Sequence, residues 1–323
     1  MEEKILKYLK QNMHNFVSGQ ELSERLNVSR TAIWKHIKNL KNLDYQIIAQ
    51  PHSGYQLLKI PDKMLPEEIS DNLKTKKIAK KIIAYKSTDS TNNIAYRLAE
   101  DGALHGTIVV SEAQSKGKGR LGRSWVSPAG VGIYLSIILR PNISPLEAGK
   151  LTLMSSVSLV RALKQVLDIN AQIKWPNDIY VDNEKVCGIL TEMSAEVDQV
   201  NFIILGIGLN VNTKASDLPK GGTSLQLKLK DKKHIDRVSL LKSILEAIEA
   251  DYLKVLKYGF NFVVEQWKKS SRTLGHDVKI KTGKKVIYGK ALDLDNNGAL
   301  VICDDTGSLQ HILSGDVTPM DSR

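Results

Sequence analysis

The first 60 residues contain apolar positions that recur at helical spacing in three short segments. These positions are Ile5, Leu6 and Leu9 in the first segment, Leu22 and Leu26 in the second, and Ile33, Ile37 and Leu40 in the third. Ser18 and Ser29 precede the second and third segments, where each can cap a helix. Only a few residues separate these two helices, and two short runs at 45–48 and 55–58 follow as a predicted hairpin. The pattern predicts a winged helix-turn-helix.

Two further patterns follow along the chain. From about residue 82 to 270, β-rich runs alternate with long helical stretches, which predicts an α/β or α+β domain with one mixed or antiparallel sheet. The predicted strands are 107–111, 132–139 and 200–209, and the predicted helices are 91–101, 148–167 and 237–258. Short strands split by tight turns follow, at 278–281, 286–294, 299–303 and 308–313, and predict a small SH3-like β-barrel.

These patterns predict a multi-domain α+β protein with three domains. We expect a winged helix-turn-helix domain at 1–64, a central α/β domain at 65–270 and a C-terminal barrel domain at 271–323. The chain has 323 residues, which is long enough for such an arrangement, and 42% of them are hydrophobic, which excludes disorder as its main state. It has no long apolar run and no secretory signal, so we expect a cytoplasmic protein with no membrane partner. Cys187 and Cys303 lie far apart and predict neither a disulfide framework nor a zinc cluster.

The charge of the chain indicates a polyanionic partner or anionic substrates. It has 46 Lys and Arg against 35 Asp and Glu, a net charge of +11, and residues 1–86 hold +7 of this excess. On the third predicted helix, polar side chains face away from the apolar positions and can reach phosphates and base edges. The candidate DNA-binding residues are Ser29, Arg30, Thr31, Lys35, His36 and Lys38. The alternative is an ordinary solvated helix face.

The segment 114–125 reads QSKGKGRLGRSW and combines three glycines with four cations. Glycine allows the backbone to approach a ligand closely, and Lys118, Arg120 and Arg123 suit a polyphosphate. The segment matches neither a P-loop nor a dinucleotide-binding fingerprint. A mobile basic surface loop is the structural alternative.

Three other short runs place polar groups where a strand or helix begins or ends. KWPND at 174–178 brings Asn177 and Asp178 next to an aromatic ring, and Asp178 can hold a magnesium ion or an amine. Lys185 follows and can neutralise charge on a transferring phosphate, or can be a solvated strand-edge lysine. DSTN at 89–92 precedes a predicted helix, where Ser90 or Thr91 can be the N-cap. In GIGLNVN at 206–212, the two glycines leave space against a strand.

These runs resemble the biotin protein ligases, specifically the bifunctional type that also represses the biotin operon. The resemblance covers essentially the whole chain and depends on five motifs in the same order. These motifs are DSTN, GKGRLGRSW, KWPND, KVCGILTE at 185–192 and GIGLNVN. One position departs from the family pattern: Lys118 stands where the loop commonly has arginine, which keeps the charge but loses the planar fork.

The resemblance implies roles for individual residues. The biotin site would include Ser90, Thr91, Asn92, Gln114, Lys118, Gly119, Arg120 and Lys185. The nucleotide and its phosphates would face Arg120, Arg123, Trp125, Asn177, Lys185 and Asn210. Catalysis would depend on Arg120, Arg123 and Lys185, with Asp178 orienting or deprotonating the acceptor amine.

The implied reaction uses biotin, ATP and Mg²⁺ to form biotinyl-5′-AMP and then transfers biotin to a lysine of a biotin carboxyl-carrier protein. The adenylate-loaded chain would form a homodimer and bind operator DNA. Two alternatives remain open at this point. One is a DNA-binding biotin sensor without ligase activity, and the other is a ligase for a related acid such as lipoate or octanoate.

Overall fold

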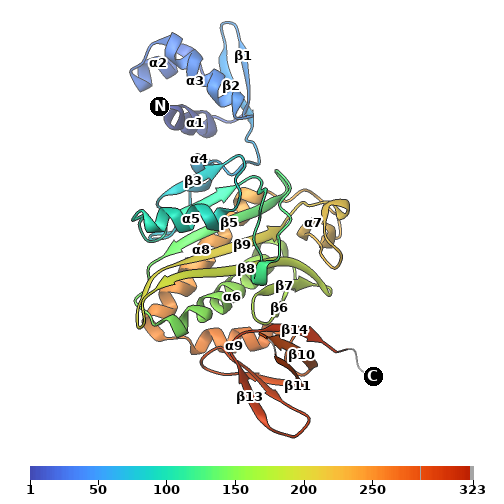
Figure 1. Ribbon diagram of the computed structural model, residues 1–323. Helices are drawn as coiled ribbons and strands as arrows, with labels where there is room; N and C mark the ends of the chain where they lie inside the picture. Colours follow the sequence, from blue (N-terminus) through green and yellow to red (C-terminus); the bar gives the residue numbers. More distant parts are fainter. Residues whose placement is uncertain (284, 321–323) are drawn as a thin grey trace. The chain divides into compact units, whose positions relative to one another are not determined.

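The apolar repeats of the first 60 residues form three helices in the computed structural model, which describes residues 1–283 and 285–320 (Figure 1). These helices are α1 (Glu2–Gln11), α2 (Gly19–Leu26) and α3 (Arg30–Asn42). Both predicted serine caps are confirmed, because Ser18 Oγ accepts the N–H of Glu21 at 3.0 Å and Ser29 Oγ accepts that of Ala32 at 3.1 Å. Asn27 ends α2 with a left-handed φ of 53°, which allows α3 to begin three residues later.

An antiparallel hairpin follows the three helices, as the sequence predicts. Its strands are β1 (Gln46–Gln50) and β2 (Gly54–Lys59). Tyr55 also exchanges backbone hydrogen bonds with Val17, which ties the hairpin to the turn between α1 and α2. These elements form one compact unit, Met1–Lys63, and the rest of the chain forms a second, Met64–Arg323. The predicted boundary between 270 and 271 stays a prediction.

A seven-stranded mixed sheet forms the centre of the second unit, in the order β3-β4-β5-β9-β8-β7-β6. The first pair is parallel and all other neighbours are antiparallel, so of the two predicted alternatives, mixed or antiparallel, the mixed sheet is observed. The strands are β3 (Ile82–Tyr85), β4 (Ile108–Ser111), β5 (Gly132–Leu139), β6 (Gln172–Lys174), β7 (Asp178–Val181), β8 (Glu184–Ala195) and β9 (Val200–Asn210).

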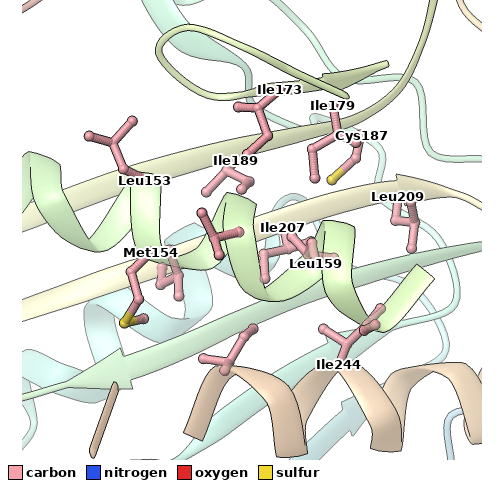
Figure 2. Close-up of a cluster of buried hydrophobic side chains, with 14 of the residues drawn as sticks. Leu153, Met154, Leu159, Ile173, Ile179, Cys187, Ile189, Ile207, Leu209 and Ile244 are labelled. Atoms are coloured by element: carbon pink, nitrogen blue, oxygen red, sulfur yellow. The ribbon is translucent and has the colours of Figure 1, made fainter. Parts of the chain in front are cut away.

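Side chains alternate between the two faces of this sheet, and each face packs against different helices. Ile207 and Leu209 of β9 join the main core with α6 (Ala148–Leu167) and α8 (Arg237–Tyr258), as Figure 2 shows. Phe202 and Ile204 of the same strand pack on the opposite face with α5 (Thr91–Glu100). Gly206 and Gly208 continue this second series, so they lie on the face of α5.

The C-terminal strands form a separate five-stranded antiparallel sheet, in the order β13-β12-β11-β10-β14. They are β10 (Asp277–Thr282), β11 (Lys285–Leu294), β12 (Leu300–Cys303), β13 (Leu309–Ile312) and β14 (Asp316–Pro319). In the described residues, β13 and β14 pair on one side only, so the sheet is open and a closed barrel is not observed. The sequence patterns missed β14, and the SH3-like form stays a prediction. Its apolar residues, including Ile280 and Ile302, belong to the same core as the central domain.

Three shorter helices complete the described part of the second unit: α4 (Pro66–Ser70), α7 (Leu225–Lys228) and α9 (Asn261–Ser270). Over residues 1–283 and 285–320, none of the helices combines the length and the apolar character needed to cross a membrane.

The buried carboxylate of Glu249 on α8 organises the chain before β3. It accepts the backbone N–H groups of Lys76, Lys77 and Ile78 at 2.5, 2.7 and 2.6 Å. Glu249→Gln replaces one acceptor oxygen by an NH₂ group that faces these donors. We expect it to lower the free energy of unfolding by about 2 kcal/mol, measured by urea unfolding followed by tryptophan fluorescence.

Glu246→Gln is the matched control on the same helix, because the Glu246 carboxylate accepts a single exposed N–H, that of Lys74, at 3.0 Å. We expect this variant to change the free energy of unfolding by less than about 0.5 kcal/mol. Equal effects of the two substitutions would show that the three backbone donors of 76–78 do not depend on Glu249.

Candidate functional site

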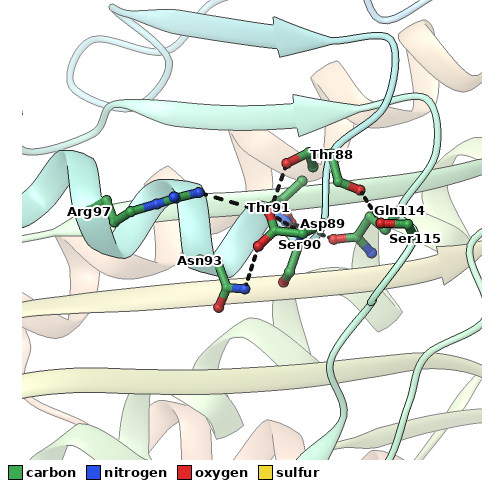
Figure 3. Close-up of polar contacts among 8 residues, drawn as sticks. All are labelled: Thr88, Asp89, Ser90, Thr91, Asn93, Arg97, Gln114 and Ser115. Carbon is green, nitrogen blue, oxygen red and sulfur yellow. Dashed lines mark hydrogen bonds and ion pairs between the residues drawn. The ribbon is translucent and has the colours of Figure 1, made fainter.

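The first turn of α5 is held by the carboxylate of Asp89, as Figure 3 shows. Asp89 accepts hydrogen bonds from Thr88 Oγ1 at 3.0 Å, Ser90 N at 2.7 Å and Asn93 Nδ2 at 2.8 Å. The hydrogen bond from Asn93 is the largest cause of the lowered pKa of Asp89. Ser90 is at the N-cap position, as predicted, but in the described structure its side chain makes no capping hydrogen bond. Its hydroxyl therefore lines the site rather than closing the helix.

A chain of hydrogen bonds connects this turn to the sheet and to the following loop. Gln114 Oε1 accepts the backbone N–H of Thr91 at 2.8 Å, and Gln114 Nε2 donates to Ser127 Oγ at 2.9 Å. The Ser136 hydroxyl of β5 donates to Asn92 Oδ1 at 2.6 Å, and its oxygen lies 2.8 Å from Thr91 Oγ1. Thr91, Asn92 and Gln114 are thus fixed in a mutually bonded set that can present polar groups to a small ligand.

The segment 117–125 forms a tight turn rather than an irregular loop. Lys118 pairs with Ser124 as an antiparallel bridge, and Gly119 N donates to Arg123 O at 2.7 Å. At the tip, Leu121 adopts a left-handed φ of 56° within a short 3-10 turn. Lys118 Nζ lies 3.2 Å from Glu192 Oε1 on β8, a single-point ion pair.

The two arginines of this segment point toward the C-terminal sheet. Arg120 donates to Asn177 Oδ1 at 3.0 Å and to the carbonyl of Gly315 at 3.3 Å. Burial lowers the pKa of Arg120, although a guanidinium keeps its charge in proteins. Arg123 forms an ion pair with Asp316 of β14, and this hydrogen bond lowers the pKa of Asp316 and raises that of Arg123. β14 and the residue just before it therefore supply a carboxylate and a carbonyl to the site.

The KWPND run lies at the turn between β6 and β7 and faces β8. Asn177 is buried and donates through Nδ2 to the carbonyl of Ile189 at 2.8 Å, which orients its oxygen toward Arg120. Asp178 Oδ1 lies 2.7 Å from Lys185 Nζ. Backbone hydrogen bonds to Gly221 and Thr223 hold Lys185 on both sides, at 3.0 and 2.9 Å. The predicted catalytic lysine is thus fixed both by its backbone and by its ammonium group.

Trp125 packs against β8 and β9 at Gly188 and Gly208, which have no side chains to fill this space. A Cβ on Gly208 would come within 2.5 Å of the indole Nε1, and one on Gly188 within 3.2 Å of the ring. Lys185 Nζ lies 5.5 Å from the centre of the same ring. The indole Nε1 is buried and finds no hydrogen-bond partner in the described part of the chain. The space that Gly208 was predicted to open is real, and an aromatic ring occupies it.

These groups surround one hollow of about 110 Å³. All but one of the predicted catalytic and ligand-binding residues line it: Ser90, Thr91, Asn92, Gln114, Lys118, Gly119, Arg120, Arg123, Trp125, Asn177, Asp178 and Lys185. Asn210 is the exception among the described residues. It is buried outside the lining and donates through Nδ2 to the carbonyl of Thr223 at 3.1 Å.

Sequence reasoning missed two charged residues of the lining, Lys174 and Asp316. Lys174 opens the KWPND run and could have been included on that signal alone, and its burial lowers its pKa. Asp316 lies in a short polar strand that no periodicity marks, and only the tertiary fold brings it to Arg123.

The described residues contain no group of three or more His, Cys, Asp or Glu side chains able to hold a metal ion by themselves. Mg²⁺ usually binds one or two carboxylates together with the phosphates of a nucleotide and several waters. Among the described residues, Asp178 and Asp316 are the two whose carboxylates line the hollow.

In the first unit, α3 presents most of the predicted DNA-binding residues to solvent. Arg30, Thr31, Lys35 and Lys38 are exposed. Two other residues differ from the prediction of a free polar face. Ser29 uses its hydroxyl to cap α3, and the half-buried His36 has Nδ1 3.3 Å from Glu2 Oε1 on α1. Both contacts lie within the unit, so a role of these two side chains in DNA binding stays a prediction.

Three protein-family models match successive parts of the chain. Residues 2–56 match a helix-turn-helix domain, residues 84–210 match the biotin/lipoate A/B protein ligase family, and residues 273–318 match the biotin protein ligase C-terminal domain. The order and positions of these matches follow the elements described above.

Similar proteins cover nearly the whole length. A bifunctional ligase/repressor BirA of Bacillus subtilis (strain 168) is 36% identical over 98% of both chains. A biotin–[acetyl-CoA-carboxylase] ligase of Paracoccus denitrificans is 31% identical over 68% of this chain and 93% of its own. A biotin protein ligase from Aquifex aeolicus, solved in complex with biotin and ATP, has 33% identity and a TM-score of 0.64 over 75% of this chain and 100% of its own. The chain therefore belongs to the biotin protein ligase family, in the group whose members join a helix-turn-helix domain to the ligase.

Proposed function

We propose that this chain is an ATP-dependent biotin protein ligase that also represses transcription. It forms biotinyl-5′-AMP from biotin and ATP, and it then transfers biotin to a lysine of a biotin carboxyl-carrier protein. The observation that carries the proposal is the convergence of Arg120, Arg123 and Lys185 on one hollow with the polar set of Thr91, Asn92 and Gln114. A biotin sensor without ligase activity would need the polar residues that bind its ligand. It would not need three cations at the same site.

The first step brings two anions together. The biotin carboxylate oxygen attacks the α-phosphorus of ATP, an O–P bond forms, and pyrophosphate leaves with the electron pair of the broken bond. Arg120, Arg123 and Lys185 screen the repulsion between carboxylate and triphosphate and stabilise charge that develops on the phosphate oxygens. Bonds to Asn177 and Gly315 fix the Arg120 fork before substrates arrive, so little reorganisation is needed.

Magnesium would contribute by neutralising the triphosphate and favouring departure of pyrophosphate. Asp178 and Asp316 are the lining carboxylates that could complete its coordination. Lys174 adds a further cation to the same wall.

In the second step the acceptor lysine amine attacks the acyl carbon of the adenylate. The new C–N bond forms, AMP leaves with the bonding electrons, and the amine gives up a proton. Asp178 lines the same hollow as Lys185, which makes its carboxylate the candidate to orient the amine or take its proton.

The first unit supplies the repressor function. We propose that the adenylate-loaded chain forms a homodimer and binds a two-fold operator through the exposed face of α3, inside the cytoplasm. Arg30, Lys35 and Lys38 on this face would contact the DNA phosphates.

The decisive experiment is biotin-dependent exchange between pyrophosphate and ATP, followed by transfer of biotin to a carrier domain. We expect both activities in the wild type, and we expect Arg120→Ala to lower the exchange rate on the order of 10²-fold. Lys269→Ala removes an exposed cation from α9 and should leave the rate unchanged.

Each contrary result has its own meaning. Absence of both activities in folded wild-type protein would reject the ligase function. If exchange is faster with lipoate or octanoate than with biotin, that acid is the substrate and biotin is not. A near-normal exchange rate in Arg120→Ala would show that Arg120 does not stabilise the reacting phosphate.

Gly208→Ala tests the role of Trp125. Because the new methyl group would lie 2.5 Å from the indole Nε1, the ring must move away from β9. We expect the KM for ATP in the exchange reaction to rise about 10-fold. Gly149→Ala on α6 is the control, because a methyl group there meets no atom beyond its own stretch of helix within 4 Å. An unchanged KM in Gly208→Ala would mean that ATP does not contact Trp125.

The double substitution Arg30→Ala and Lys35→Ala tests the DNA-binding face without touching the ligase. Loss of two phosphate contacts should weaken binding to a duplex selected by the wild type and flatten the slope of log K against log salt by roughly 2. Biotin transfer should stay at the wild-type rate. Lys4→Ala with Lys7→Ala removes the same charge from α1, and an equal loss of binding there would indicate a purely general charge effect.

A further inference from the structure

The outward face of α3 carries an exposed tryptophan that the DNA-binding pattern did not include. Trp34 is the fifth residue of this helix and 57% of its surface is accessible. By contrast, Trp175 and Trp267 are almost completely buried and Trp125 is half-buried. The ring of Trp34 is exposed on the same helix as the predicted DNA-binding residues Arg30, Lys35 and Lys38.

The charge around Trp34 indicates what kind of partner fits this surface. Arg30 lies one helical turn before it and Lys38 one turn after, with Lys38 Nζ 5.5 Å from the ring centre. The 13 residues of α3 include four Lys or Arg and no Asp or Glu. An aromatic ring between cations, on a helix without acids, complements a polyanion that also offers apolar groups.

The shape of the surface adds a second constraint. Trp34 borders a hollow of about 720 Å³ between α3 and the hairpin, where it lies with Arg30, Thr31 and Gln50. On its other side it borders a hollow of about 470 Å³ together with Lys35 and Lys38. The indole is therefore a ridge between two concave strips, both of which contain cations. The groove of a DNA duplex has a complementary shape, because a phosphate backbone borders it on each side and the ridge can enter between them.

We propose that Trp34 enters the major groove of double-stranded DNA and recognises a thymine through contact with its C5 methyl group. The thymine methyl is the apolar group that the major groove offers to a side chain, and the first residues of a recognition helix are those that reach base edges. The flanking Arg30 and Lys38 contact phosphates, so the cations give affinity and the indole gives sequence preference. This inference rests on the DNA-binding part of the proposed function and names the residue that makes it selective.

The test uses a duplex enriched from a random-sequence library by the wild-type chain in the presence of biotin and ATP. Each thymine of this duplex is then replaced in turn by deoxyuridine, which removes only the C5 methyl group. We expect one position in each half-site where the replacement lowers wild-type affinity about fourfold. Trp34→Ala should bind the parent duplex about 10-fold more weakly and should show no further loss at that position.

Two control variants separate recognition from folding. Trp34→Phe keeps an apolar ring and should retain part of the sensitivity to deoxyuridine. Phe16→Ala removes an exposed aromatic ring that lies outside α3 and should bind both duplexes like the wild type. Far-UV circular dichroism and biotin transfer should be unchanged in all of these variants.

Three results would overturn the inference. Equal losses from deoxyuridine in the wild type and in Trp34→Ala at every position would show that Trp34 contacts no thymine methyl and acts only on the backbone. Unchanged DNA binding by Trp34→Ala would show that Trp34 does not contact DNA. This is the result expected if the surface around Trp34 binds a protein instead. If the wild type enriches no duplex at all, the DNA-binding function fails and this inference fails with it.

Discussion

The alternation of side chains along β9 is the constraint on which the rest of the ligase depends. One series of residues, such as Ile207 and Leu209, is buried against α6 and α8 and holds the sheet in the core. The other series includes Gly206 and Gly208, which have no side chain to fill the opposite face. Asn92 and Trp125 lie in the space that results. A strand can therefore be part of the hydrophobic core and form the floor of a polar site without any loss of register.

The cations of the site are held by partners that a substrate can replace. Arg123 pairs with Asp316, Lys185 with Asp178, and Lys118 with Glu192. Each pair is partly solvated, so it adds only a small amount to stability, but it keeps the cation in place and partly neutralised. An incoming carboxylate or triphosphate exchanges one anionic partner for another. This exchange costs less than bringing an unpaired, fully hydrated cation into a closed site.

Much of this architecture could be predicted from the sequence, because the signals were local. The long helices α6 and α8 have the predicted bounds, and the caps of α2 and α3 are those that Ser18 and Ser29 indicated. The parts that were missed depend on tertiary contacts. β14 is too short and polar to show a period, so neither the strand nor Asp316 could be recognised. The contact of His36 with Glu2 on α1 and the hydrogen bond from Asn210 to Thr223 are further examples. No regular sequence spacing connects the residues of either pair.

The same distinction explains why motif order was more informative than any single motif. A glycine-rich basic loop or a lysine at a strand edge has an ordinary structural explanation when it is considered alone. The structure shows what these segments share, since α5, the 117–125 turn, the β6–β7 turn, β8 and β14 all contribute to one hollow. Residues from such distant segments can be brought together only if each segment keeps its own register in the sheet. A set of motifs in fixed order therefore carries information about geometry that the composition of each motif does not.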